Sequence, residues 1–270
     1  MREAAVVRRS WVEHIMGMPV SIHLRGVAGQ SRWRSTVEAV FAELCEVDQI
    51  FSIYNADSDV SRLRREEVTT AQCHQLVGEV LDLCEQARLV TGGYFDAWQQ
   101  GPDGVIRLDP SGLVKGWAVQ RSALRLAELG DDYYLNAGGD IAVSCAEPES
   151  PSWRIGIEDA DQPGSLFGVL EVRGGGVATS GTGHRGGHVI DPTTGSAATA
   201  LRSVTVVGPS LMWADVYATA ALARGRDAIS WIRWPPGYEA LAVSPGGDRS
   251  LTAGMRTLLE SSRRTHSARS

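Results

Sequence analysis

The order of helical and strand patterns along the chain limits the folds that it can adopt. Apolar residues recur at the spacing of one helix face in residues 35–51 and 72–90, and Ser35 with Glu38 fits a capping box at the first of these helices. Further helices are expected at about 113–129, 211–224 and, more weakly, 227–233. Short β-rich segments are expected at 18–24, 133–143, 153–157, 166–173, 203–207 and 239–243. Because these patterns do not alternate as βαβ units do, the sequence predicts an α+β fold.

Length and composition predict a globular protein with one domain. The 270 residues contain 43% hydrophobic side chains and no internal repeat or low-complexity linker. We expect residues 1–260 to form a single domain and residues 261–270 to be a disordered tail. The four cysteines form no C-x-x-C pair, which favours reduced core residues.

Charge and hydropathy exclude two classes of partner. The formal net charge of −6 does not favour nucleic-acid binding. No stretch reaches the roughly 20 apolar residues that span a bilayer, and no signal-peptide core follows the N-terminus. We therefore expect a cytoplasmic protein without a membrane span.

Asp215 and Thr219 form a candidate metal site on the expected late helix. They are four residues apart, so their oxygens lie on one helical face. A hard cation such as Mg²⁺ prefers such oxygens together with substrate phosphate. The alternative is an ordinary helical Asp with a Thr that bonds back to its own helix, and that alternative is favoured when the pair is taken alone.

Three further segments have both a binding and a structural interpretation. The segment 136–140 (Asn-Ala-Gly-Gly-Asp) suits either close approach to a ligand or a tight turn. The segment 179–188, with small residues, hydroxyls, Arg and two His, is either a mobile anion-binding loop or a solvated loop. The segment 109–116 places Lys115, the only lysine, at a helix start that suits an anion or is simply capped.

The order of these motifs resembles the ApbE family of FAD:protein FMN transferases. The resemblance covers roughly residues 11–225. Its motifs are Met16-Gly17, Tyr54 before Asp57-Ser58, Gly93–Asp96, Asp109–Gly116, Asn136–Asp140, Thr179–Gly181, His188–Gly195, and Ala214-Asp215 with Thr219. It implies a fold related to the tunnelling-fold class, with mixed helices and antiparallel sheet. It also implies that FAD is split, that FMN is placed on a Thr or Ser of an acceptor protein, that AMP is released, and that a divalent cation, usually Mg²⁺, is required.

The resemblance also assigns roles by position. It implies metal ligands at Asp215, Thr219 and the backbone carbonyl of Gly112, and a catalytic His188 that activates the attacking hydroxyl. The positions that match or border flavin contacts are Met16, Tyr54, Tyr94, Phe95, Asp96, Asp109, Lys115, Thr179, Ser180 and Ile190.

Two other functions use the same motifs. A metal-dependent FAD pyrophosphatase would let water replace the acceptor hydroxyl and would release FMN and AMP. A flavin-binding protein without turnover is the third interpretation, supported by loops that are shorter than is usual in the family. The chain contains no convincing acceptor motif of its own, so self-flavinylation is not expected.

Overall fold

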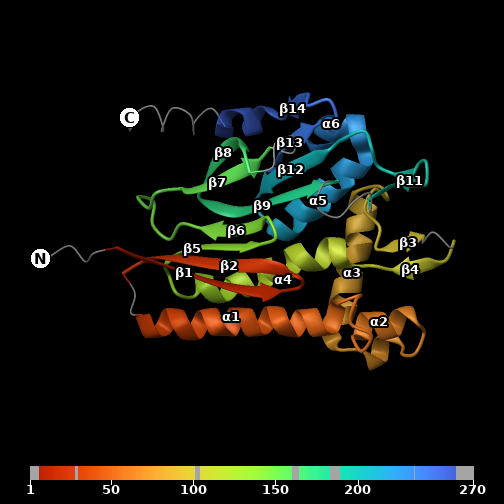
Figure 1. Ribbon diagram of the computed structural model, residues 1–270, viewed down its shortest axis with the longest axis horizontal. Helices are drawn as coiled ribbons and strands as arrows, with labels where there is room; N and C mark the ends of the chain where they lie inside the picture. The colour runs from red at the N-terminus through yellow and green to blue at the C-terminus, as the bar shows by residue number, and fades with distance from the viewer. Residues whose placement is uncertain are drawn as a thin grey trace, which may run out of the picture.

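An eight-stranded antiparallel sheet with helices packed against it confirms the predicted α+β fold (Figure 1). The computed structural model describes residues 6–27, 30–100, 104–159, 164–182, 189–233 and 235–259. In sheet order the strands are β1 (Val7–Ile15), β2 (Met18–Gly26), β5 (Asp132–Ala137), β6 (Asp140–Ser144), β9 (Gly174–Gly181), β12 (Ser203–Gly208), β13 (Glu239–Val243) and β14 (Arg249–Leu251). Every neighbouring pair is antiparallel.

Helices α4 and α5 contact one face of this sheet, and α1 packs against α4 (Figure 1). The helices are α1 (Gln30–Phe51), α2 (Asp59–Arg64), α3 (Gln75–Val90), α4 (Ser111–Ala127), α5 (Leu211–Arg224) and α6 (Ala228–Ile232), with short 3₁₀ turns η1 (Thr70–Gln72) and η2 (Gly225–Asp227). Three two-stranded ribbons complete the described chain: β3 (Trp98–Gln100) with β4 (Ile106–Leu108), β7 (Trp153–Glu158) with β8 (Leu166–Val172), and β10 (Ile190–Asp191) with β11 (Ser196–Ala197).

Alternation along the strands divides the buried side chains between the two faces of the sheet. In β6, Ala142 belongs to the larger core shared with α1, α4 and α5. Its neighbours Ile141 and Val143 belong to a second core with the β7–β8 ribbon and the C-terminal helical residues 253–259. Each strand residue therefore faces either the helices or the second core, as a period of two requires.

The expected helices are present, but several local predictions were wrong. Helix α1 begins at Gln30, so Ser35 lies inside it and donates to the Ser31 carbonyl at 3.2 Å instead of capping it. Residues 179–181 lie in strand β9 between β6 and β12, where the sequence predicted a loop. Strand β1 and the β3–β4 ribbon were not predicted. No described helix is long and apolar enough to cross a membrane. The predicted tail, 261–270, lies outside the described residues.

Gly176 in β9 allows α5 to approach the sheet. A Cβ placed on Gly176 would lie 2.5 Å from the Cα of Leu211, the first residue of α5. Backbone cannot yield to such a contact without shifting the helix. We expect Gly176→Ala to lower the free energy of unfolding by about 1–3 kcal/mol, measured by denaturant titration.

Gly78→Ala is the matched control for this substitution. Gly78 lies inside α3, and a Cβ there would meet no atom within 4 Å. Alanine should raise the free energy of unfolding by about 0.5–1 kcal/mol because it favours helix. Equal effects of the two substitutions would contradict the packing role of Gly176.

Candidate active site

Two carboxylates and one ammonium group meet where α4, α5 and β6 come together. Lys115 in α4 places its Nζ 2.6 Å from Oδ2 of Asp140, at the start of β6. The same Nζ lies 4.0 Å from Oδ1 of Asp215 in α5. Both aspartates are almost completely buried, and Lys115 is partly exposed. We call Lys115, Asp140 and Asp215 the buried charge cluster.

Glycine lets the helix that carries Lys115 come close to Asp215. The Gly116 backbone N–H donates to Oδ2 of Asp215 at 3.2 Å. A Cβ on Gly116 would lie 2.9 Å from the Asp215 Cβ and 3.2 Å from the Met212 Cα. The α4–α5 contact at the cluster therefore requires the absence of a side chain at position 116.

The turn between β5 and β6 places Asp140. Gly138 and Gly139 have φ values of 57° and 97°, in the left-handed region that favours glycine. The Gly139 N–H donates to the Asn136 side-chain oxygen at 2.9 Å, and the Gly138 N–H donates to the Pro19 carbonyl at 3.3 Å. The Gly-Gly-Asp segment is thus a hairpin turn that also presents a buried carboxylate.

The cluster has more negative than positive charge. Among the described residues, Lys115 is the only cation within 4.0 Å of either carboxylate. Burial, followed by repulsion from Asp140, raises the pKa of Asp215 well above its ordinary value, while Lys115 and the Gly116 N–H oppose this shift. Two carboxylates that share one ammonium can accommodate a further cation or a proton.

A pair of hydroxyls lies next to the cluster on the helix side of the sheet. Thr219 is one turn after Asp215 in α5, and its Oγ1 is 3.0 Å from Oγ of Ser180 in β9. The predicted pairing of Asp215 and Thr219 on one helix is confirmed. Asp215 and Thr219 therefore present a carboxylate and a hydroxyl from one face of α5, and a hard cation accepts both kinds of oxygen.

Thr179 points away from that junction. Its Oγ1 is 2.9 Å from Oγ1 of Thr205 in β12, whereas the adjacent Ser180 contacts α5. Only the Thr179 backbone N–H approaches the cluster, at 3.4 Å from Oδ1 of Asp140. The two hydroxyls that the sequence grouped together therefore serve opposite faces of the sheet.

Asp109 and Gly112 flank the first residue of α4, and Phe95 packs close to Gly112. The Asp109 N–H donates to the Ala97 carbonyl at 2.6 Å, and its Oδ1 accepts from the Ser111 N–H at 3.1 Å. Phe95 is buried, and its ring edge would lie 3.3 Å from a Cβ on Gly112. A side chain at position 112 would therefore press on the Phe95 ring at the start of α4.

The neighbouring aromatic and acidic residues are fixed by local contacts. The Arg224 guanidinium, at the end of α5, lies 4.3 Å from the centre of the Tyr94 ring. Oδ1 of Asp96 accepts from the Trp98 N–H at 2.8 Å. The Arg224–Tyr94 contact joins the segment after α3 to the end of α5, whereas the Asp96–Trp98 hydrogen bond is local to that segment.

Three predicted residues that the structure describes, Tyr54, Ile190 and Met16, form no hydrogen bond or ion pair with the cluster. Tyr54 is 94% exposed in the loop after α1, and Ile190 in β10 is 37% exposed. Met16 has a φ of 55° in the β1–β2 turn and packs against the larger core. His188 lies outside the described residues.

Sequence reasoning missed Asp140 as a site residue. Its signal was an acidic side chain directly after two glycines and before the apolar run Ile141–Val143. An acid at the start of a buried strand needs a partner, and Lys115 is that partner. Among the described residues, no group of three or more His, Cys, Asp or Glu is placed to hold a metal. A cation at this cluster would therefore need hydroxyl, carbonyl, water or phosphate oxygens as well.

The fold is shared with solved structures. It is similar to the ApbE protein of Thermotoga maritima, with a TM-score of 0.80 and 19% identity over 94% of this chain and 99% of that chain. It is also similar to the flavin transferase ApbE of Vibrio cholerae, with a TM-score of 0.77 and 22% identity over 94% of this chain and 100% of that chain.

Curated relatives named FAD:protein FMN transferase match part of the chain. The Chlamydia trachomatis protein is 26% identical over 215 residues, which are 72% of this chain and 66% of the relative. The Escherichia coli K12 protein is 28% identical over 156 residues, 54% of this chain and 44% of the relative. The matched regions thus span less than two thirds of each relative's length. A sequence model described as the ApbE family matches residues 16–101 and 99–242. The chain therefore belongs to the ApbE family.

Proposed function

We propose that this protein transfers FMN from FAD to a Ser or Thr hydroxyl of an acceptor protein and releases AMP. Family membership and the name shared by its relatives support this activity. The observation that carries the proposal is the buried charge cluster beside the Ser180–Thr219 hydroxyl pair. It combines an ammonium for phosphate oxygens with oxygen ligands for a cation.

The cluster fits a divalent cation by charge and by donor type. When both are ionised, Asp140 and Asp215 carry one more negative charge than Lys115 balances, and Mg²⁺ prefers carboxylate, hydroxyl and phosphate oxygens. We propose Asp215, Thr219 and the Gly112 carbonyl as its protein ligands. When bound, the cation would neutralise the diphosphate and stabilise charge on the leaving oxygen.

The protein residues then have separate tasks in the transfer. The P–O–P bond of FAD breaks, the acceptor oxygen bonds to the FMN phosphorus, and AMP leaves with the bridging oxygen. We propose that Lys115, which pairs with Asp140, donates to phosphate oxygens of FAD. His188 is our proposed general base for the hydroxyl proton, by resemblance alone. Met16, Tyr54, Tyr94, Phe95, Asp96, Asp109, Ser180 and Ile190, with the Thr179 backbone, remain proposed FAD contacts. A cytoplasmic location also stays a prediction.

Product analysis tests the proposed reaction. With FAD, Mg²⁺ and a candidate acceptor, we expect AMP release and an acceptor mass increase equal to FMN minus water. Chelation of Mg²⁺ should abolish both. Free FMN and AMP with an unmodified acceptor would instead indicate hydrolysis, and no product across a panel of acceptors would contradict an active enzyme.

Asp215→Asn should separate stability from function. The amide keeps the shape of Asp215 and can accept from the Gly116 N–H, but it removes one buried negative charge beside Asp140. We expect the metal-free variant to be more stable than wild type by about 1–2 kcal/mol, because like-charge repulsion is relieved. The stabilisation of the wild type by Mg²⁺ with ADP should be lost, as thermal unfolding would report.

Asp82→Asn controls for the change in net charge. Asp82 is exposed on α3, so this variant should keep both the wild-type stability and its response to Mg²⁺ with ADP. A full response to Mg²⁺ in Asp215→Asn would show that Asp215 is not a ligand.

A further inference from the structure

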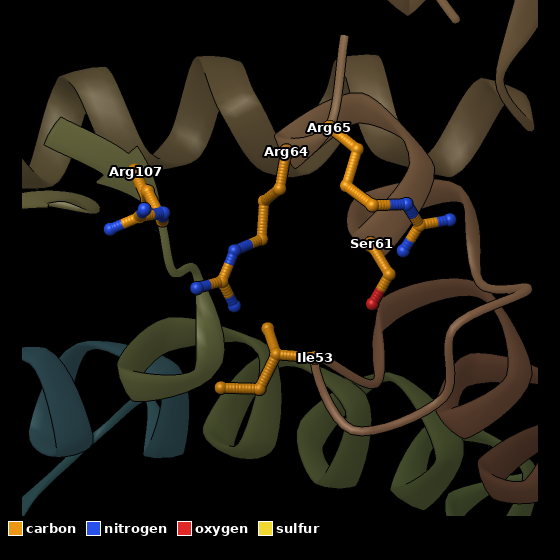
Figure 2. Close-up of a pocket in the computed structure, with 5 residues that line it drawn as sticks. All are labelled: Ile53, Ser61, Arg64, Arg65 and Arg107. Carbon is orange, nitrogen blue, oxygen red and sulfur yellow. The ribbon is translucent and has the colours of Figure 1, made fainter. Parts of the chain in front are cut away.

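A pocket of about 240 Å³ lies apart from the residues of the buried charge cluster. Its lining is Ile53, Ser61, Arg64, Arg65 and Arg107, which come from the loop after α1, from α2 and the residue after it, and from β4. Figure 2 shows the Arg64 side chain between Arg107 and Ser61, above Ile53. The lining contains three arginines and no acidic residue.

The arginines near the pocket differ in how they are neutralised. Arg65 forms a two-bond pair with Glu67, at 2.7 and 2.9 Å, and also donates to the Ala56 carbonyl. Arg62, which does not line the pocket, lies 3.9 Å from Asp59. The side chain of Arg64 forms no hydrogen bond or ion pair with any described residue, and it is only partly exposed. Its charge therefore remains available to a ligand inside the pocket.

We propose that this pocket binds a phosphate-type oxyanion, with Arg64 as its main ligand and Arg107 beside it in the lining. The planar guanidinium fork matches the oxygens of a phosphate group in a two-bond arrangement. The volume is below the roughly 300–1,000 Å³ of pockets that enclose drug-sized ligands, so it suits a single group rather than a whole dinucleotide. The source is either free phosphate or the phosphate of a mononucleotide.

Binding there would link two segments that lead into the proposed flavin site. Ile53 directly precedes Tyr54, and Arg107 lies two residues before Asp109. An oxyanion held by Arg64 and Arg107 would join α2 to β4, two elements that already touch. We therefore expect phosphate to stabilise the fold as well as to bind.

Calorimetric titration with inorganic phosphate at constant ionic strength tests the site. Wild type should bind one phosphate, and Arg64→Gln should weaken its affinity about tenfold or more. Arg62→Gln removes the same charge from the same helix outside the pocket and should change affinity less than about threefold. Arg64→Lys should fall between wild type and Arg64→Gln because it keeps the charge without the fork. Equal affinities in wild type and Arg64→Gln would overturn the proposal.

Two further measurements fix the location and the source of the oxyanion. Lys115→Gln, which removes the ammonium of the buried charge cluster, should keep wild-type phosphate affinity, so this test stands even if the proposed transfer reaction fails. Loss of binding in Lys115→Gln with full binding in Arg64→Gln would move the phosphate to the cluster and overturn the proposal. If AMP binds more tightly than phosphate and adenosine does not bind, the natural ligand is the phosphate of a nucleotide. If phosphate binds as tightly as AMP, the natural ligand is the free ion. Phosphate should also raise the unfolding temperature of wild type more than that of Arg64→Gln.

Discussion

The unequal sharing of one ammonium by two buried carboxylates is the constraint on which the rest of the site depends. Taking these charges out of water is costly unless the partners lie within hydrogen-bond distance. Because α4, α5 and β6 converge, Lys115 reaches that distance from Asp140, at 2.6 Å, and lies 4.0 Å from Asp215. The close contact in turn requires Gly116 on α4, where a side chain would collide with Asp215. The cluster can therefore form only where α4 and α5 pack this closely.

Strand alternation decides which side chains can reach the cluster. Ser180 contacts Thr219 on the helix side, while Thr179 bonds to Thr205 on the other side. The same two-residue alternation of side chains divides the apolar residues between the two cores, one on each face of the sheet. Thr179 and Ser180 are adjacent in the sequence, but their side chains lie on opposite faces of the sheet. Only Ser180 faces α5, the helix that carries Asp215.

The long helices and the Asp215–Thr219 pair could be predicted because their signals are local. Apolar spacing over several turns identifies a helix, and a separation of four residues identifies one face. Strand β9 could not be predicted in this way. It begins Gly174-Gly175-Gly176, which carries no strand propensity, and it is formed by pairing with β6 and β12. The role of Asp140 was missed for a related reason, since its partner Lys115 lies in a different element and only the fold brings them together.

Direct measurement of metal binding tests the central claim that the buried charge cluster is completed by a divalent cation. Mn²⁺, which can replace Mg²⁺ at oxygen sites and is visible by electron paramagnetic resonance, would be titrated into the protein with ADP present. The account predicts one bound Mn²⁺ per chain in wild type beyond that held by ADP alone, and none in Asp215→Asn. The same bound Mn²⁺ in both proteins, or none in wild type, would contradict it.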